Sequence, residues 1–279
     1  MTSIHQINQQ LKSFAEERKL DFNEARIVLA IERLMARLQT DHELSQHLVF
    51  KGGFILLRVF GSSRFTRDLD ALASRIETEE LIKRVKACIR LDLEDHFWFG
   101  DEKQEDMVPD DPYGTVRFNM AFQLGPKPDA SKIKKLSRIH FDIGFGDVIT
   151  PKPTKVKMES LVSGLSSISA EVYPIETVLA EKLDAFVARE SLNSRAKDLL
   201  DLVRFLPDGL KSKDLKSAIE RTFSNRGTEK PSSYVEFAKS LDLQSLRSAW
   251  PSVKEFSNQQ EFNDVWTELL KLLEELDNL

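Results

Sequence analysis

Cysteine is nearly absent from this chain of 279 residues, which contains Cys88 alone. One cysteine cannot form a disulfide within the chain or supply the several thiolates of a cysteine-based zinc site. We therefore expect a protein of a reducing compartment, the cytoplasm. The N-terminus lacks a basic-then-apolar leader, and Lys51 and Arg58 interrupt the longest apolar run, so we expect neither export nor a membrane span.

Signatures of several common chemistries are also missing. The five histidines show no H-x-x-x-H metal-ligand spacing, and Ser62 and Ser63 lie in no G-x-S-x-G elbow. The absence of a G-x-x-x-x-G-K-[ST] loop argues against a P-loop ATPase. The net charge of −5 argues against a uniformly basic nucleic-acid-binding surface. Two local basic segments, 127–138 and 152–157, are either solvated loops or contacts for a phosphate backbone.

Apolar residues make up 41% of the chain, enough for a sizeable core. We predict an α/β (α+β) protein with a core lobe over 1–160, which includes N-terminal helices, and a helical lobe over 161–279. Apolar periodicity predicts strands over 47–50, 69–73, 116–123 and 139–145 and, after a weak N-terminal helix, helices over 22–38, 52–60, 78–90, 174–190, 196–206, 212–224, 232–240 and 260–277.

Three details complete the predicted fold. Asn23 is the expected cap of the helix over 22–38. The acidic segment 101–113, which contains two prolines, is expected to be a mobile surface loop without chemistry. Beyond the break at Pro151 and Pro153, no element is assigned before residue 172.

The most informative segment runs from Lys51 to Asp70, because a glycine pair precedes two aspartates separated by one apolar residue. On a strand, Asp68 and Asp70 face the same side. Two carboxylates on one face can hold a divalent cation, and Gly52 and Gly53, opening a helix, offer backbone N–H groups to phosphate oxygens. The segment therefore predicts a metal-dependent enzyme that acts on a nucleotide.

Asp142 is a candidate third carboxylate. In the strand over 139–145 it points away from Ile139, Phe141 and Ile143, towards the face that the polar side chains share. A solvent-facing strand residue is the ordinary alternative for Asp142 alone. His140 shares that face, and a structural histidine is the favoured interpretation there. Three carboxylates on adjacent strands would supply the oxygen ligands of magnesium, and two such ions can assist an in-line nucleotidyl transfer.

Lys182 and Asp198 are the candidates in the helical half. Lys182 stands on the apolar stripe of the helix over 174–190, so it either extends past the apolar surface to solvent or turns inward to the phosphates of a nucleotide. Asp198 lies in the first turn of the next helix, where an acidic residue is ordinary helix-dipole chemistry. Its functional alternative is a carboxylate that orients Lys182 or contacts the nucleotide.

Four separated segments resemble one family in its own order. They are Lys51-Gly52-Gly53, Arg64 to Asp70, Phe141 to Asp147, and Pro174 to Arg189 with Arg195 to Leu202. Over residues 47–205 the chain resembles the AbiEii/AbiGii nucleotidyltransferase toxins of the DNA-polymerase-β-like superfamily. Phe54 stands where that family commonly carries a small hydroxyl residue, which removes a side-chain contact to phosphate but keeps the backbone donor of Gly53.

The resemblance implies a nucleotidyltransferase-like mixed sheet flanked by helices and a site that uses Mg²⁺, with two ions possible, and a nucleoside triphosphate. Asp68 and Asp70 would bind the metal, Asp142 would be a third ligand or the base, and Lys182 would contact the triphosphate, with Asp198 as the other essential residue of the helical lobe. Secondary candidates for phosphate contacts, besides Gly52 and Gly53, are Ser62, Ser63, Arg64, Thr66 and Arg67.

The family also implies a toxin that transfers nucleotides to an RNA acceptor, with tRNA the expected target, and a cognate antitoxin protein. In the expected arrangement the nucleotide lies in a cleft between the two lobes. Two alternatives stay open at this point. One is transfer to a small molecule or a protein side chain, and the other is a non-catalytic binding protein with a vestigial metal site.

Overall fold

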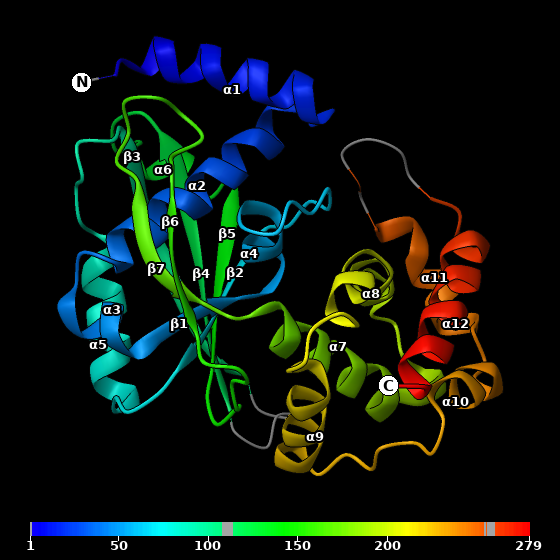
Figure 1. The fold of residues 1–279 in the computed structure, drawn as a ribbon. Coiled ribbons are helices and arrows are strands. Elements are labelled where there is room, and N and C mark those ends of the chain that lie inside the picture. Colours follow the sequence, from blue (N-terminus) through cyan, green and yellow to red (C-terminus); the bar gives the residue numbers. More distant parts are fainter. Residues whose placement is uncertain (1, 108–113, 254, 256–259) are drawn as a thin grey trace. The chain divides into compact units, whose positions relative to one another are not determined.

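The computed structural model describes residues 2–107, 114–253, 255 and 260–279, and the chain divides into two compact units (Figure 1). The first unit comprises residues 1–146 and 155–172, and the second comprises residues 147–154 and 173–279. Because residues 147–154 belong to the second unit, the chain passes from one unit to the other three times.

A seven-stranded mixed sheet forms the centre of the first unit, in the order β3-β4-β5-β2-β1-β7-β6. β2 runs parallel to β5 and β1 runs parallel to β7, whereas the pairs β1–β2, β3–β4 and β4–β5 are antiparallel. The strands are β1 (Leu48–Lys51), β2 (Asp68–Ala73), β3 (Phe97–Met107), β4 (Thr115–Leu124), β5 (Arg138–Gly144), β6 (Thr154–Met158) and β7 (Ile168–Val172). The predicted mixed sheet and its α/β class are confirmed.

One face of the sheet is apolar. Phe118 and Phe50 stack on the two sides of Phe141, with ring centroids 6.4 and 6.5 Å from that of Phe141. Phe118 and Phe141 alternate with polar residues along β4 and β5, as expected for a sheet with one face in the core. On these two strands and at the start of β2, the opposite face carries polar side chains, including the predicted aspartates.

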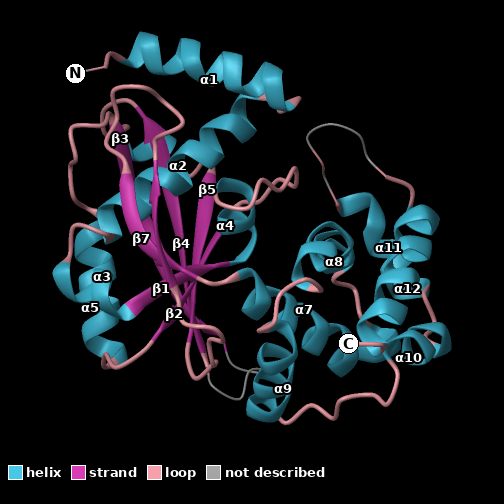
Figure 2. Ribbon diagram, viewed as in Figure 1, coloured by secondary structure: helices cyan, strands magenta, loops and turns pink. Residues whose placement is uncertain are grey.

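Helices of the first unit cover this core (Figure 2). α2 contacts β2, β5 and α5, and it begins in a capping box in which the Asp21 carboxylate accepts from the Glu24 N–H and the Glu24 carboxylate accepts from the Asp21 N–H. Asp21, not Asn23, is therefore the cap. The helices are α1 (Ile4–Arg18), α2 (Phe22–Leu38), α3 (His42–His47), α4 (Gly52–Arg58), α5 (Thr78–Ile89) and α6 (Ala130–Ile133).

α2 also buries charged side chains that the apolar periodicity did not indicate. Arg37 is fully buried and donates to both oxygens of Asp95, at 2.7 and 2.8 Å, and to the carbonyl of Phe97. One turn earlier, the buried Glu32 accepts from the Ser160 hydroxyl and the Leu161 N–H, which anchors the connection between β6 and β7 to α2. Buried charges with complete hydrogen bonding of this kind fix how elements dock.

Two sequence-based expectations are corrected here. Residues 101–107, expected in a surface loop, continue β3, which pairs with β4 at the edge of the sheet. An edge strand exposes much of its surface, so its polar residues show no alternation. The rest of that expected loop, 108–113, lies outside the described residues. The unassigned stretch before residue 172 contains β6 and β7, so residues 161–172 lie in the first unit, beyond the predicted boundary at 160.

The second unit is helical over its described residues (Figure 2). α7 contacts α8 and α9, and α12 contacts α8 and α10, around a core that includes Phe186, Phe237 and Trp266. The elements are α7 (Ile175–Arg189), η1 (Glu190–Leu192), α8 (Ala196–Gly209), α9 (Leu215–Arg226), α10 (Tyr234–Ser240), α11 (Gln244–Ala249), η2 (Trp250–Ser252) and α12 (Phe262–Asp277). Among the described helices of the whole chain, none has the length and apolar character needed to cross a bilayer.

Residues 147–154 are held in the second unit by polar contacts. Arg226 of α9 donates to both oxygens of Asp147 at 3.0 Å and to Asp184 of α7 at 3.1 Å. The Thr177 hydroxyl donates to the carbonyl of Thr150 and accepts from its N–H. These contacts explain why a segment that follows β5 directly packs with helices encoded later.

Candidate active site

Two neighbouring parallel strands place the first group of predicted residues together. The register sets Asp68 opposite His140 and Asp70 opposite Asp142. Alternate residues of a strand share a face, so these four side chains lie on the polar face of the sheet while Leu69, between the aspartates, is fully buried. We call Asp68, Asp70, His140, Asp142 and their neighbour Arg117 the carboxylate face. The predicted placement of the three aspartates on one face is confirmed.

Asp142 is clamped by an arginine of β4. Arg117 lies opposite Asp142 in the register and donates to its two oxygens, with Nε and Nη2 at 2.7 and 2.6 Å. This fork-to-fork pair is the strong geometry of an arginine and a carboxylate. The hydrogen bond to Asp142 raises the pKa of Arg117 against the effect of burial, and the charges of Asp142, Asp68 and Asp70 raise that pKa further. Both oxygens of Asp142 are thus engaged by protein.

The first glycine of the pair makes room for Asp70. Gly52 opens α4 with a φ of +74°, and a Cβ at this position would lie 1.9 Å from an oxygen of the Asp70 carboxylate. Glycine meets both demands, because it adopts a positive φ readily and has no Cβ. The start of α4 and the Asp70 carboxylate therefore approach as closely as backbone and side chain can.

The second glycine lies against the segment that leads into β2. A Cβ at Gly53 would lie 2.9 Å from a guanidinium nitrogen of Arg64 and 3.2 Å from Thr66. Ser62, Arg64 and Thr66 are buried and shape this segment, with the Ser62 hydroxyl accepting from the Arg64 N–H and the Thr66 hydroxyl from the Asp68 N–H. Arg67 is exposed, with its guanidinium over the ring of Phe65. Of the secondary phosphate candidates, Arg64 and Thr66 therefore lie beside the second glycine, and burial limits what Ser62 and Thr66 can reach.

The donor set of the carboxylate face suits a hard divalent cation. Magnesium is usually held by one or two carboxylates together with substrate phosphates, not by a cage made of protein alone. Asp68 and Asp70 match that requirement, being half-exposed carboxylates on one face at the first residues of β2. Within the described part of the chain no group of three or more acidic, histidine or cysteine side chains is arranged to hold a metal, in keeping with the pairing of Asp142 to Arg117.

The second group of predicted residues lies in the second unit, on α7 and α8. The Lys182 ammonium lies 2.5 Å from Asp198 and 2.8 Å from Asp201, and Asp198 also accepts from Arg195 Nε at 2.5 Å. Exposed fractions are 11% for the Lys182 side chain, 9% for Asp198 and 1% for Asp201. We call these four residues the lysine cluster. The Lys182 ammonium therefore pairs with two carboxylates of α8 and does not extend to solvent, while its contact with nucleotide phosphates and the orienting role of Asp198 stay predictions.

The charges of the lysine cluster control the ionisation of Asp198. Burial alone would raise the pKa of this carboxyl, but the charges of Lys182 and Arg195, and the hydrogen bonds that both donate, hold its pKa well below the ordinary value. Asp198 is therefore ionised at neutral pH. The cluster pairs two cations with two anions inside the helical unit.

Residues 33–277 match the profile of a family described as nucleotidyl transferase AbiEii toxin of type IV toxin–antitoxin systems. The chain belongs to the AbiEii family. The resemblance carried by the four sequence segments is confirmed, and the matched range extends beyond them at both ends, into α2 and to the end of α12.

This AbiEii chain is also similar to two crystal structures from Helicobacter pylori. The first, JHP933, has a TM-score of 0.57 and 16% identity, over 89% of this chain and 90% of that one. The second, described as a candidate nucleotidyltransferase, has the same TM-score and identity over 89% of this chain and 92% of the other. The predicted nucleotidyltransferase fold is confirmed. No curated protein sequence matches the chain.

Several partners of the predicted residues were not predicted from the sequence. Arg117 and Asn119 are two of them, because the register that brings them to Asp142 and His140 cannot be inferred from one strand. Asp201 follows Asp198 by three residues, one turn along α8, and it was not considered for a contact with Lys182. The three-residue spacing on α8 could have indicated that Asp201 lies beside Asp198. The contact of Arg117 with Asp142 requires knowledge of the strand pairing, which the sequence does not provide.

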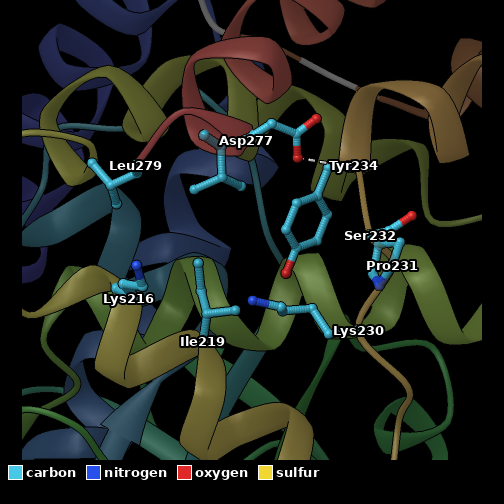
Figure 3. Close-up of a pocket in the computed structure, with 9 residues that line it drawn as sticks. Lys216, Ile219, Lys230, Pro231, Ser232, Tyr234, Asp277 and Leu279 are labelled. Carbon is cyan, nitrogen blue, oxygen red and sulfur yellow. Dashed lines mark hydrogen bonds between the residues drawn. The ribbon is translucent and has the colours of Figure 1, made fainter.

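A pocket of the AbiEii chain, drawn in Figure 3, lies apart from all the predicted residues. It has a volume of about 380 Å³ in the second unit, and its lining includes Lys216, Ile219, Lys230 and Tyr234. The Tyr234 hydroxyl is buried without a hydrogen-bond partner among the described residues, and burial raises its pKa above the ordinary value, so it stays protonated. The predicted carboxylates Asp68, Asp70 and Asp142 do not line this pocket.

Proposed function

We propose that this AbiEii family member is a magnesium-dependent nucleotidyltransferase toxin that transfers nucleotides from a nucleoside triphosphate to an RNA acceptor, tRNA being the proposed class. The observation that carries the proposal is the carboxylate face, where Asp68 and Asp70 share one face of β2 and Asp70 lies against the glycine that opens α4. Family membership supports the reaction class. The RNA acceptor rests on the family resemblance.

In the proposed reaction, the acceptor hydroxyl attacks the α-phosphorus of the triphosphate. A new bond forms between that oxygen and the phosphorus, the bond from the α-phosphorus to the bridging oxygen breaks, and pyrophosphate leaves. Asp68 and Asp70 hold magnesium, which when bound supplies charge stabilisation for the transferring phosphoryl group. Asp142 is the proposed acceptor of the hydroxyl proton, and it can take that proton only after giving up a hydrogen bond from Arg117.

The phosphate contacts are assigned on the same basis. The backbone N–H groups at Gly52 and Gly53 and the guanidinium groups of Arg64 and Arg67 are the proposed donors from the first unit. Ser62 and Thr66 support that segment. Lys182 is proposed to contact the triphosphate and Asp198 to hold Lys182 in position, since that ion pair is already formed.

Two further parts of the proposal concern the cellular setting. The cognate antitoxin is the proposed protein partner, because the family belongs to type IV toxin–antitoxin systems. The cytoplasm is the proposed compartment, since the chain contains one cysteine. That residue, Cys88, is buried, and burial raises its pKa to about 12, so it does not compete with the carboxylates as a nucleophilic thiolate.

Labelled nucleotide transfer tests the proposal. Purified full-length protein is incubated with Mg²⁺, total cellular RNA and each of the four labelled nucleoside triphosphates in turn. Asp68→Ala and Lys182→Ala are run beside it, with Asp92→Ala and Lys211→Ala as matched controls, since both control residues are exposed and lie outside the predicted site and the two basic segments. We expect label in a discrete RNA band, lost in the first two variants and kept in the controls.

The other outcomes each contradict a different part of the proposal. Label in protein or in a small molecule, and not in RNA, would replace the RNA acceptor by another one. Full transfer by Asp68→Ala would overturn the assignment of the carboxylate face. No label in any acceptor would favour a non-catalytic binding protein.

A further inference from the structure

A chain of hydrogen bonds crosses the carboxylate face and ends on Asp68. His140 Nδ1 lies 2.9 Å from Asp68 Oδ1, and His140 Nε2 lies 3.2 Å from the side-chain nitrogen of Asn119. Asn119 Oδ1 in turn accepts from Nε of Arg138. Arg138 is fixed at its other nitrogens by the side chain and carbonyl of Asp101, at 2.7 and 2.6 Å. Residues of four strands, β3, β5, β4 and β2, are thus joined in one line.

The chemistry of the groups sets the direction of every bond in this chain. An arginine only donates, so the Asn119 atom that faces Arg138 is the carbonyl oxygen and the atom that faces His140 is the amide nitrogen. That nitrogen only donates, so His140 Nε2 must accept. The single ring proton of His140 therefore lies on Nδ1, and it is donated to Asp68 Oδ1. Both ring nitrogens are engaged, which leaves His140 no role as a base in this arrangement.

Asp68 depends on this contact for its orientation. Its side chain is 39% exposed, and among the residues that the structure describes His140 is the one side chain that donates to it. An exposed carboxylate without such a partner rotates between several conformers. With Oδ1 held by His140, the other oxygen, Oδ2, is fixed in direction and carries no hydrogen bond from a described residue.

We propose that His140, oriented by Asn119, is a positioning residue that holds Asp68 ready to bind the divalent cation through Oδ2. The inference rests on the proposed function, because it requires Asp68 to be a metal ligand. Partners that orient a ligating side chain typically contribute about 10- to 100-fold to metal affinity. His140 acts on the cation only through Asp68, since both of its nitrogens face protein.

Two substitutions of His140 separate the hydrogen bond from the bulk of the ring. The side-chain nitrogen of asparagine is bonded to Cγ, as Nδ1 is in histidine, so His140→Asn keeps a donor for Asp68. His140→Leu fills a similar space without a donor. Gln123→Leu is the matched control, because Gln123 lies on the same strand as Asn119 and bonds only to the nearby carbonyl of Pro126 among the described residues.

Direct binding of Mn²⁺, followed by the EPR signal of the free ion, provides a measurement that does not depend on turnover. We expect the Kd for Mn²⁺ to rise by about 10-fold or more in His140→Leu, and to stay within about 3-fold of the parent in His140→Asn and Gln123→Leu. The Mg²⁺ concentration for half-maximal transfer should shift in parallel with that Kd. Thermal unfolding identifies any variant that has lost its fold.

Asp68→Ala distinguishes the two levels of the proposal. If Asp68→Ala leaves the Kd for Mn²⁺ unchanged, the metal site of the proposed function is wrong. If Asp68→Ala removes binding but a folded His140→Leu binds Mn²⁺ as the parent does, the positioning role is overturned and the metal site stands. Loss of binding in His140→Leu together with retention in His140→Asn supports the positioning role, and an equal loss in both folded variants contradicts it.

Discussion

The carboxylate face of the first unit and the lysine cluster of the second unit differ in how far their charged side chains are exposed and in whether those side chains are already paired. On the carboxylate face, Asp68 and His140 stay partly exposed, and one oxygen of Asp68 is free of hydrogen bonds from described residues. In the lysine cluster, Lys182 is nearly buried and already bonded to two carboxylates. A ligand can reach the first site without displacing a partner of Asp68, whereas at the second it must compete with an ion pair formed during folding.

Because of this difference, substitutions of charged residues at the two sites should affect different properties, namely activity and stability. A buried pair that loses one partner leaves an uncompensated charge, which destabilises a protein by about 3–5 kcal/mol. A half-exposed carboxylate keeps part of its hydration in the folded protein, so its charge contributes less to stability than a buried pair does. We therefore expect substitutions on the carboxylate face to reduce activity and substitutions in the lysine cluster to reduce stability first.

Asp70→Asn should have the largest effect on activity. The amide keeps the size of the side chain but removes a charge proposed to bind Mg²⁺, and losing several kcal/mol of charge stabilisation slows transfer by about 10³-fold. Steady-state transfer of labelled nucleotide measures the loss, and thermal unfolding identifies a variant that has lost its fold. Transfer at more than a tenth of the parent rate would contradict a metal-binding role for Asp70.

Asp201→Leu should have the largest effect on stability. It leaves the buried Lys182 with one of its two carboxylate partners, and we expect the free energy of unfolding to fall by about 3 kcal/mol, at the lower end of the cost of a broken buried pair. Urea unfolding measures this change. The double variant Asp201→Leu/Lys182→Met should recover much of the loss, because it removes the buried charge as well. A double variant less stable than Asp201→Leu would mean that the ion pair is not the cause.

Acid should destabilise the second unit through Asp198. The folded-state pKa of this carboxyl is depressed, so its contribution to stability is complete above the unfolded pKa of about 4 and is lost as pH falls from there towards the folded value. Over that range one such group lowers the free energy of unfolding by up to about 1.4 kcal/mol per pH unit. Urea unfolding between pH 5 and pH 3 should show a smaller slope in Asp198→Asn. Equal slopes would contradict the depressed pKa.

Gly52→Ala should combine both kinds of effect at a smaller size. A positive φ costs a non-glycine residue about 1 kcal/mol or more, and the new Cβ would also displace the Asp70 carboxylate. Gly61→Ala is a matched control, because its φ of +73° is nearly the same and a Cβ there meets no atom within 4 Å. Both variants should lose similar stability, but only Gly52→Ala should lose transfer activity. Equal activity in the two would mean that Asp70 tolerates the displacement.

Neutralising the basic segment at α6 should have the smallest effect. Lys134 and Lys135 are exposed, so Lys134→Ala/Lys135→Ala should leave the unfolding temperature unchanged. If this segment contacts the RNA backbone, transfer to RNA should fall by a few-fold and its salt dependence should weaken by about two charges. Lys83→Ala, another exposed position of the first unit, is the control. An unchanged salt dependence would mean that the segment is a solvated loop that does not contact the RNA backbone.

Much of the sheet and most helices were predictable, because their apolar residues repeat with a clear period. Alternation marked β4 and β5 and placed Asp142 on the polar face, and the glycine pair marked the start of α4. All of β3 was missed, and its residues 101–107 were expected in a loop, because an edge strand needs no apolar alternation. β6 and β7 were also missed, although the residues of β7 alternate between buried and exposed.

The partners within the site were less predictable than its members. A single sequence does not reveal which residues lie opposite each other on paired strands. It therefore cannot show that Arg117 contacts Asp142 or that Asn119 contacts His140. It also cannot show that the inserted segment 147–154 is tied to α7 and α9 through Asp147 and Thr150. These contacts depend on pairing between distant segments, which local propensity does not encode.

The threefold passage of the chain between the two units restricts how this protein can be taken apart or recombined. No single cut leaves both units whole, because a break after residue 146 separates β6 and β7 from the rest of their sheet, and a break after residue 172 removes residues 147–154 from the helices. A fusion protein built from the helical half alone would lack residues 147–154 or include part of the sheet. A truncation that removes the carboxylate face would likewise remove part of the helical unit or leave part of the sheet behind. A recombination that keeps both units whole must therefore exchange residues 1–279 as one piece.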